Sequence, residues 1–314
     1  SVELYVWKNK KKSNDDNYMQ ILNKFEIKNN LKVCHYPQVS PIANSFISSY
    51  YLSLKIKFKK IDFIISRNLR FAYFACNNGI PIFYETHKPL NLYNFIDKFL
   101  FKKMIRMKKF YSLITISSYL INDYNQYPYF KKINKLMLRD SSDINDHLFS
   151  QKKNSKPSVG YVGSLYKGRG IEIIIELSRL LKNVDFHIIG DYKKFYSNIK
   201  NINSSNLILH GYIDHKDAIK KMSEFDLLLA PYNSKVEVPG GVNTHKWMSP
   251  IKLFEYMSVK KPIITSNLAA IKEFMVHDYN CLIVDENDTI EWKNAILKIL
   301  NDKNLSNKLA SNAY

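Results

Sequence analysis

The sequence predicts an α/β protein built from two doubly wound domains, each with a parallel sheet covered by helices. Three observations predict this fold. Short apolar runs alternate with longer segments that are apolar on one face only, the pattern of strands alternating with helices. Many of the short runs end in glycine or a polar residue, which places loops along one edge of each sheet. A polar, lysine-rich segment at 146–157 separates an expected first domain (1–145) from a second (158–314).

The composition fits this two-domain prediction. A chain of 314 residues suits two domains better than one, and a hydrophobic content of 46% is ample for packed cores. No run of 18 apolar residues predicts a transmembrane helix, and residues 1–20 lack the pattern of a signal peptide. The three cysteines are far apart and match neither a zinc site nor a disulfide framework, so we expect a cytoplasmic protein.

The net charge of +19 is the extreme feature of the composition. Such a charge attracts polyanions, which include nucleic acid, anionic lipid and phosphorylated substrates. The chain is also crowded with Lys, Asn, Ile, Tyr and Phe, a bias that an AT-rich genome produces without selection for binding. Both interpretations of the charge remain open at this point.

In the first half, two polar residues stand where predicted strands end. Arg67 follows the strand 62–65, and His87 follows the strand 81–84. Arg67 is a candidate ligand contact or an ordinary surface arginine. His87 could bond a sugar hydroxyl, act as a base or be structural. Strands are expected at residues 2–7, 31–35, 62–65, 81–84, 113–116 and 135–138, and helices at 18–25, 44–57, 69–77, 92–110 and 118–124.

The expected helix 92–110 is amphipathic. Phe95, Ile96 and Phe99 mark one face, and six lysines and arginines supply charge around it. Apolar residues beside clustered lysines suit a helix that lies on an anionic membrane surface. The same stripe would also suit packing against a core, with the basic side chains in solvent.

In the second half the alternation becomes regular, and two loops there combine glycines with cations. Strands are expected at 159–163, 185–189, 207–210, 226–230, 263–265 and 281–284, with helices at 171–181, 216–223, 271–274 and 289–300 and another between Pro250 and Lys260. The first loop carries Lys167 and Arg169 just before the helix 171–181. The second carries Gly240 and Gly241 ahead of the helix that follows Pro250. Neither loop matches the dinucleotide fingerprint or the phosphate loop of nucleoside triphosphatases.

The helix after Pro250 is the strongest candidate for an anion site. Ser249 is a favourable N-cap, and Ile251, Phe254 and Met257 form an apolar stripe for packing. This stripe would leave Lys252 and Glu255 on the open face. A helix N-terminus with glycines before it and a lysine beside it suits a phosphate, and the carboxylate of Glu255 could accept both hydroxyls of a ribose. A diphosphate held between two cationic loops needs no metal ion.

The combined pattern resembles a family-4 glycosyltransferase with the GT-B fold, in which a cleft separates two Rossmann-like domains. The resemblance is carried by YVGSLYKGRGIEIIIEL (161–177), LILHGYIDHKDAIKKMSEFDLLLAPY (207–232) and MSPIKLFEYMSVKKPIITSN (248–267). FYETH (83–87) carries it less sharply in the first domain. The resemblance implies transfer of a sugar from a nucleotide sugar, with retention at the anomeric carbon and without a metal or other cofactor.

The resemblance also implies roles for individual residues. Arg169 and Lys252 would hold the diphosphate, Glu255 matches the second glutamate of a Glu-x7-Glu motif that binds the ribose, and His87 would contact the transferred sugar. His87, Arg169 and Lys252 are therefore the candidate catalytic residues. The remaining candidate contacts with the nucleotide sugar, including the loop whose backbone meets the base, are Gly163, Lys167, Gly211, Tyr212, Ile213, Gly240, Gly241 and Ser249.

The sequence departs from the family pattern at several places. Trp247 stands where the first glutamate of the Glu-x7-Glu motif belongs, and Ser164 stands where many members have arginine. Compared with resembling chains, the first domain lacks its first strand and glycine-rich loop, and the second lacks a last helix. We therefore expect either a fragment or a shortened first domain.

Three functions are compatible with these observations. The leading hypothesis is a retaining glycosyltransferase that uses a UDP-linked sugar and an envelope glycan, lipid-linked or polysaccharide acceptor, at the inner face of the plasma membrane. A UDP-sugar epimerase of related GT-B architecture is the second. A non-enzymatic basic protein that binds membrane or nucleic acid is the third, although aromatic-basic RNA motifs are not evident and no nucleic-acid partner is expected.

Overall fold

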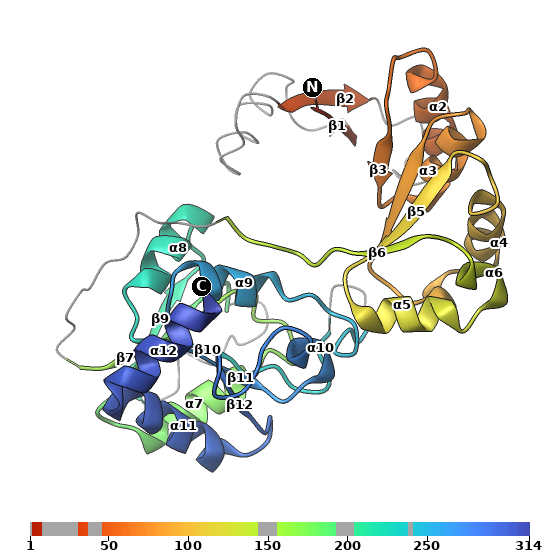
Figure 1. Ribbon diagram of the computed structural model, residues 1–314. Helices are drawn as coiled ribbons and strands as arrows, with labels where there is room; N and C mark the ends of the chain where they lie inside the picture. The colour runs from red at the N-terminus through yellow and green to blue at the C-terminus, as the bar shows by residue number, and fades with distance from the viewer. Residues whose placement is uncertain (1, 8–30, 37–45, 144–155, 193–203, 238–240) are drawn as a thin grey trace. The chain divides into compact units, whose positions relative to one another are not determined.

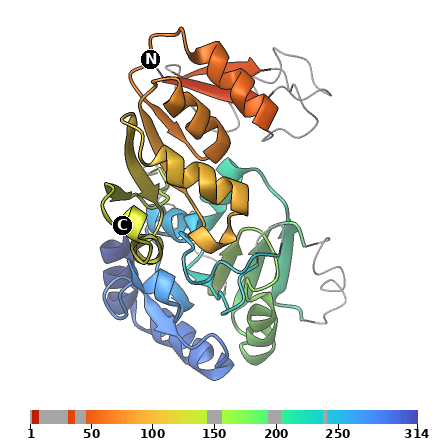
Figure 2. The same cartoon turned by 90° about the vertical axis from the view of Figure 1, so that its right-hand side faces the viewer.

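The computed structural model describes residues 2–7, 31–36, 46–143, 156–192, 204–237 and 241–314 (Figures 1 and 2). The chain divides into two compact units. Unit 1 comprises residues 1–115 and 120–138, and unit 2 comprises residues 116–119 and 139–314. The expected helix 18–25 and most of the expected linker 146–157 lie outside the described residues.

Unit 1 contains a parallel pair of strands, β1 (Val2–Trp7) and β2 (Leu31–Tyr36), and a parallel sheet with the strand order β3-β4-β5-β6. The strands of this sheet are β3 (Ile64–Ser66), β4 (Ile82–Thr86), β5 (Phe110–Thr115) and β6 (Lys135–Met137). Its helices are α2 (Phe46–Ile56), α3 (Leu69–Asn77), the 3-10 turn η1 (Leu90–Leu92), α4 (Phe95–Met104), α5 (Ser118–Asn125) and α6 (Pro128–Lys131).

The core of unit 1 forms around Phe101 of α4. Its ring meets Tyr84, Tyr124 and Phe130 edge to face, with centroids 4.8–5.8 Å apart. Aromatic rings packed at such angles add a favourable electrostatic term to the area that they bury. This contact fixes which face of α4 is turned inward, so that Phe95 is 84% exposed on the other side.

The helix predicted over 92–110 exists only in its middle part, as α4 (Phe95–Met104), so the predicted bounds are wrong. Leu92 belongs to η1, and the Asn94 side chain caps α4 by accepting a hydrogen bond from the Asp97 backbone N–H at 2.8 Å. The helix ends at Met104, and Phe110 already belongs to β5, where it pairs with β4. The prediction was too long because apolar residues in the turns before and after α4 happen to continue the helical period.

Unit 2 contains a six-stranded parallel sheet with the order β12-β11-β10-β7-β8-β9. Its strands are β7 (Ser158–Val162), β8 (Asp185–Ile189), β9 (Leu207–Gly211), β10 (Leu227–Ala230), β11 (Ile263–Ser266) and β12 (Leu282–Val284). Its helices are α7 (Ile171–Leu180), α8 (His215–Ser223), α9 (Ile251–Ser258), α10 (Ala269–Lys272), α11 (Thr289–Asn301) and α12 (Lys303–Ala313).

Helices cover both faces of this sheet (Figures 1 and 2). One apolar cluster packs α7 and α11 against the strands through Leu177 and Trp292, and the other packs α8 and α9 through Met222 and Tyr256. All five residues of β7 are buried as a result. A strand that is buried on both faces explains why the sequence there is a continuous apolar run.

Two predictions about α9 are wrong. Its N-cap residue is Pro250, because the Ser249 hydroxyl instead accepts a hydrogen bond from the Asp140 backbone N–H at 3.0 Å. The predicted packing stripe is also displaced. Ile251 is 50% exposed, whereas Lys252, expected on the open face, is only 9% exposed.

Helices α6 and α12 were not predicted from the sequence. The α6 segment is a single turn that begins at Pro128, too short to show a period. Helix α12 carries few apolar residues, but the Asp302 carboxylate caps it by accepting from the Leu305 N–H at 2.9 Å, and Leu309 is fully buried.

Candidate functional site

The strand order of unit 2 identifies where a ligand should bind. From β7 the chain continues to β8 and β9 on one side, whereas β10 leads to β11 and β12 on the other. The order therefore reverses between the neighbouring strands β7 and β10. In open α/β sheets, ligands bind outside the carboxyl ends of the strands at this switch point.

Lys252 lies at this switch point with an unpartnered charge. Its Nζ is buried and has no hydrogen-bond partner among the described residues. It lies 3.5 Å from the centre of the Tyr161 ring and 5.3 Å from that of Tyr232. Burial holds the pKa of this ammonium well below its usual value, repulsion from Arg169 lowers it further, and Glu255 opposes both. Since buried charges are normally paired, this ammonium is arranged to receive an anion.

Gly163, the residue after β7, makes room for the lysine. Its φ of 143° is unfavourable for other residues, and a Cβ at this position would lie 2.6 Å from Cε of Lys252. Any side chain at this position would displace Lys252. Gly163 therefore acts by allowing the lysine to lie against the end of β7.

Arg169 supplies the second cation. Its guanidinium carbon lies 5.1 Å from the centre of the Tyr232 ring, and its Nε is buried with no hydrogen-bond partner in the part of the chain that the structure describes. The flanking glycines 168 and 170 both have positive φ, and a Cβ on Gly170 would lie 1.8 Å from the Pro231 carbonyl oxygen. The loop thus passes so close to the end of β10 that only glycine fits. Tyr232 lies within reach of both cations.

Other buried polar atoms near the same strand ends also lack partners within the described residues. Asn233 Oδ1 follows β10, and Ser266 Oγ ends the neighbouring strand β11. Several unsatisfied polar atoms in one region are unusual, because most buried polar atoms form hydrogen bonds. Together with Lys252 and Arg169, they indicate a polar ligand site at the central strands of unit 2.

Trp247, which stands at the missing acidic position, is another such residue. Its indole Nε1 is buried and finds no hydrogen-bond acceptor among the residues described, and its ring stacks on Tyr119 with centroids 6.0 Å apart. The position therefore offers an N–H donor where the family motif has a carboxylate acceptor. This change inverts the hydrogen-bonding preference at that point.

Glu255 is held by a residue that the sequence analysis missed. His215 Nε2 lies 2.8 Å from Glu255 Oε1, so the first residue of α8 pairs with the middle of α9. His215 lies two residues after the loop expected to meet the nucleotide base, and this proximity was the available signal. The pair spans 40 residues of sequence, so local spacing does not reveal it.

The remaining predicted ligand residues of unit 2 have no described contact with Lys252 or Arg169. Gly211 ends β9 with a φ of 74°, and Tyr212 beyond it is exposed. Lys167 is exposed in the loop before α7, and Gly241 is exposed with a φ of 75°. Ser249 faces Asp140, Ile213 packs partly into the apolar core, and Gly240 lies outside the described residues.

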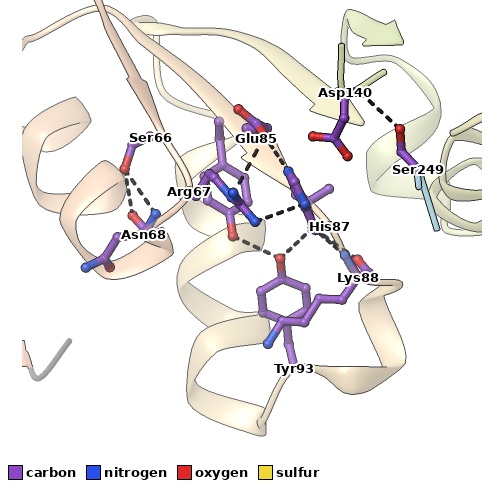
Figure 3. Close-up of polar contacts among 11 residues, drawn as sticks. Ser66, Arg67, Asn68, Glu85, His87, Lys88, Tyr93, Asp140 and Ser249 are labelled. Atoms are coloured by element: carbon purple, nitrogen blue, oxygen red, sulfur yellow. Dashed lines mark hydrogen bonds and ion pairs between the residues drawn. The ribbon is translucent and has the colours of Figure 1, made fainter. Parts of the chain in front are cut away.

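Unit 1 contains a pocket of about 410 Å³ where β3 and β4 end and α3 begins (Figure 3). His87 lies in its wall, and its two ring nitrogens have different partners. Nδ1 is 2.9 Å from Arg67 Nη2, and Nε2 bonds to the Glu85 carboxylate. The bond from His87 lowers the pKa of the Glu85 carboxyl, the charge of Arg67 acts in the same direction, and burial opposes them. The structure thus places the predicted residues Arg67 and His87 in contact.

Two further properties bear on possible ligands. Within the described residues, no group of three His, Cys, Asp or Glu side chains is placed to hold a metal ion. No helix in the described part of the chain has the length and apolar character needed to cross a membrane.

The two units, each with a parallel sheet and helices, have the architecture of the GT-B fold, and comparison with solved structures supports this assignment. HepE of Anabaena, solved in complex with UDP, matches with a TM-score of 0.69 at 14% identity, over 100% of this chain and 93% of HepE. WaaG, a glycosyltransferase involved in lipopolysaccharide biosynthesis, matches with a TM-score of 0.61 at 14% identity, over 100% of this chain and 94% of WaaG. At these identities the likeness establishes the fold.

Sequence comparison matches part of the chain to a glycosyltransferase family. The family described as "Glycosyl transferases group 1" matches residues 156–302, the part that carries Arg169, Lys252 and Glu255. The uncharacterized glycosyltransferase MJ1178 of Methanocaldococcus jannaschii is 25% identical over 211 residues, which cover 64% of this chain and 52% of MJ1178. The chain spans about half the length of the curated relatives it matches. The predicted resemblance to a family-4-like glycosyltransferase is thus confirmed, and residues 156–302 match the group 1 family model.

Proposed function

We propose that the protein is a retaining glycosyltransferase that moves a sugar from a UDP-linked sugar to an acceptor hydroxyl. The observation that carries the proposal is the buried, unpartnered ammonium of Lys252 beside Arg169, at the switch point of a glycosyltransferase group 1 domain. Two cations that repel one another and lack an anion are suited to a diphosphate.

The chemical step follows from these charges. As the bond between sugar and diphosphate breaks, negative charge grows on the phosphate oxygens. Arg169 can contact two oxygens at once, and Lys252 adds a point charge at a buried position, where electrostatic interactions are strong. The acceptor oxygen bonds to the anomeric carbon from the face that the diphosphate leaves, which retains the anomeric configuration. The proton of the acceptor hydroxyl passes to the departing diphosphate. These two cations take the place that a metal ion would otherwise fill.

The nucleoside is assigned by Glu255 and by the likeness to HepE. Glu255 would accept hydrogen bonds from the ribose hydroxyls, with His215 orienting the carboxylate. HepE has been solved with UDP, with UDP and glucose, and with UDP-glucose. These complexes support uridine as the base. His87 retains the role that the resemblance implies, a contact with the transferred sugar.

Calorimetry of UDP binding tests this assignment. Arg169→Ala and Glu255→Ala should each weaken binding by about 10- to 100-fold, because each removes charge-assisted hydrogen bonds. Arg179→Ala is the matched control, since Arg179 is exposed at the last turn of α7. Unchanged affinity in both site variants would refute the proposal. Free sugar or its isomer formed without an acceptor would instead support the epimerase.

The acceptor is proposed to be an envelope glycan, lipid-linked or polysaccharide, reached at the inner face of the plasma membrane. The observation behind this is α4, where Phe95, Ile96 and Phe99 are exposed beside lysines. Phe95→Ser with Phe99→Ser should lower binding to anionic vesicles. Phe58→Ser is the control, an exposed phenylalanine outside α4. Equal binding by all three proteins would show that the exposed stripe has no membrane role.

A further inference from the structure

The unit 1 pocket contains an excess of positive charge once its ion pairs are counted. Arg70 is neutralised by Asp97, with Nε to Oδ1 at 2.9 Å and Nη2 to Oδ2 at 3.4 Å. The carboxylate of Glu85 forms a hydrogen bond with Nε2 of His87, and its Oε1 lies 3.8 Å from Nε of Arg67. Lys88 forms no ion pair within the described residues, and its Nζ lies 4.0 Å from the centre of the Tyr93 ring.

The setting of Lys88 favours an anionic ligand. Burial lowers the pKa of its ammonium, and Asp97 opposes this shift only from a distance. An anion in the pocket would offset the cost of burial. The pocket also opens on the N-terminus of α3, formed by Asn68, Leu69 and Arg70. The N–H groups of Asn68 and Phe71 already donate to Ser66 Oγ and Asn68 Oδ1, at 3.1 and 3.2 Å. This end of α3 therefore attracts an anion mainly through its positive partial charge.

The contacts of His87 identify which cation can move. A guanidinium only donates hydrogen bonds, so Nδ1 of His87 must accept the bond from Arg67 and Nε2 must carry the proton that bonds Glu85. Both ring nitrogens are therefore occupied, as Figure 3 shows. Of the two partners, Arg67 has a side chain that is 65% exposed, whereas Glu85 is largely buried. Arg67 can swing away at small cost, and Glu85 cannot.

We propose that this pocket binds a phosphate group of the acceptor between Arg67, Lys88 and the N-terminus of α3. Binding draws the guanidinium of Arg67 from His87 to the phosphate, so that Nδ1 becomes free to accept a hydrogen bond from a sugar hydroxyl. Arg67 is thus a positioning residue that occupies His87 until the phosphate is bound. The identification of the ligand as an acceptor rests on the proposed function, but phosphate binding itself does not.

The test uses the full chain with methyl phosphate as a soluble probe and vesicles containing phosphatidic acid as a lipid-bound one. Calorimetry should detect methyl phosphate binding that weakens at least tenfold in Lys88→Met and in Arg67→Gln. Arg106→Gln, an exposed arginine of unit 1 outside the pocket, should bind as the unaltered protein does. Vesicle binding that depends on Lys88 would identify a lipid-linked phosphate. A response to methyl phosphate alone would identify a soluble phosphate ester.

A second readout follows His87 itself. In protein labelled with ¹⁵N-histidine, methyl phosphate should shift the Nδ1 signal of His87, and Arg67→Gln should shift it before any phosphate is added. If the Nδ1 signal of His87 does not shift in either experiment, the proposal that Arg67 moves from His87 to the phosphate is refuted.

The donor site is tested in the same series, so that the two proposals can fail separately. Lys88→Met should leave UDP binding unchanged, and Arg169→Ala should leave methyl phosphate binding unchanged. Loss of methyl phosphate binding in Arg169→Ala, or its persistence in both pocket variants, would refute the pocket. Loss of UDP binding alone in Arg169→Ala supports the donor assignment whatever the pocket does.

Discussion

Replacing Lys252 by methionine should make the free protein more stable and, at the same time, weaken its binding of a nucleotide sugar. Methionine has nearly the same length and can keep the packing against Tyr161 and Gly163. It removes an ammonium that is buried without a hydrogen-bond partner. A change that stabilises the fold and impairs binding is the expected behaviour of a residue retained for function rather than for stability.

The size of the stability change follows from opposing contributions. A buried charge without a partner costs about 3–5 kcal/mol, and neutralisation of part of the population reduces this cost because burial lowers the pKa of Lys252. The contact with the Tyr161 ring at 3.5 Å returns about 2 kcal/mol. The net gain for Lys252→Met is about 1–2 kcal/mol, which raises the melting temperature of a domain of this size by about 2–8 °C.

Loss of a charge-assisted bond to phosphate should weaken binding by about 1.5–3 kcal/mol, or roughly 10- to 150-fold. Calorimetry with UDP-glucose should also detect proton uptake at pH values between the pKa of Lys252 in the free protein and its pKa in the complex. A bound diphosphate raises the lowered pKa of Lys252, so binding takes up as much as one proton in the unaltered protein. The affinity is therefore highest at pH values below the pKa of Lys252 in the free protein. It falls as the pH rises from that pKa toward the pKa of Lys252 in the complex.

Three measurements check this reasoning. Thermal unfolding without ligand gives the stability, titration gives the affinity, and the change of binding enthalpy between buffers of different ionisation enthalpy gives the proton count. Lys272→Met, at an exposed lysine of α10, is the control and should leave all three unchanged. The reasoning is refuted if Lys252→Met lowers the melting temperature or keeps the same proton uptake.

Two further predictions concern the stability of unit 2. Burial, followed by the charge of His210, lowers the pKa of His187 to about 4 from its usual 6.5. The folded state therefore loses roughly 2 kcal/mol as pH falls from 6.5 to 4, and His187→Phe should remove most of this loss in urea unfolding at the two pH values. Gly170→Ala should cost roughly 2–4 kcal/mol in the same assay, from positive φ and the clash with Pro231. The control is Gly79→Ala in unit 1, where φ is also positive but the space is open. It should cost unit 1 only about 1 kcal/mol, and equal costs would contradict the clash.

The alternation of strands and helices could be predicted because it depends on local period. Buried parallel strands are short apolar runs, and the helices between them bury one face, so most predicted elements agree with the structure to within a few residues. The prediction failed where a capping side chain, such as Asn94 or Asp302, decides where a helix begins. It also failed to anticipate pairs that lie far apart in sequence, such as His215 with Glu255.

The error in predicting which face of α9 is buried has a specific cause. Two apolar stripes compete on this helix, one with Ile251 and Phe254 and one with Leu253 and Tyr256. The period alone does not distinguish them. The Tyr256 hydroxyl accepts a hydrogen bond from the Val162 backbone N–H at 2.8 Å and thereby fixes which stripe turns inward. Lys252 neighbours this stripe and is carried inward with it.

A sequence signal for the burial of Lys252 nevertheless existed in the surrounding residues. The resemblance assigned Gly163 to the ligand, but the structure shows that this glycine leaves space for the lysine side chain. Tyr161 and Tyr232, at the ends of neighbouring strands, supply rings that tolerate a cation where an aliphatic wall would not. A glycine and two tyrosines at adjacent strand ends, facing a helix that begins with lysine, predict that the lysine lies inside the site. On this reasoning, Gly163→Ala should displace Lys252 and weaken nucleotide-sugar binding even though it removes no polar group.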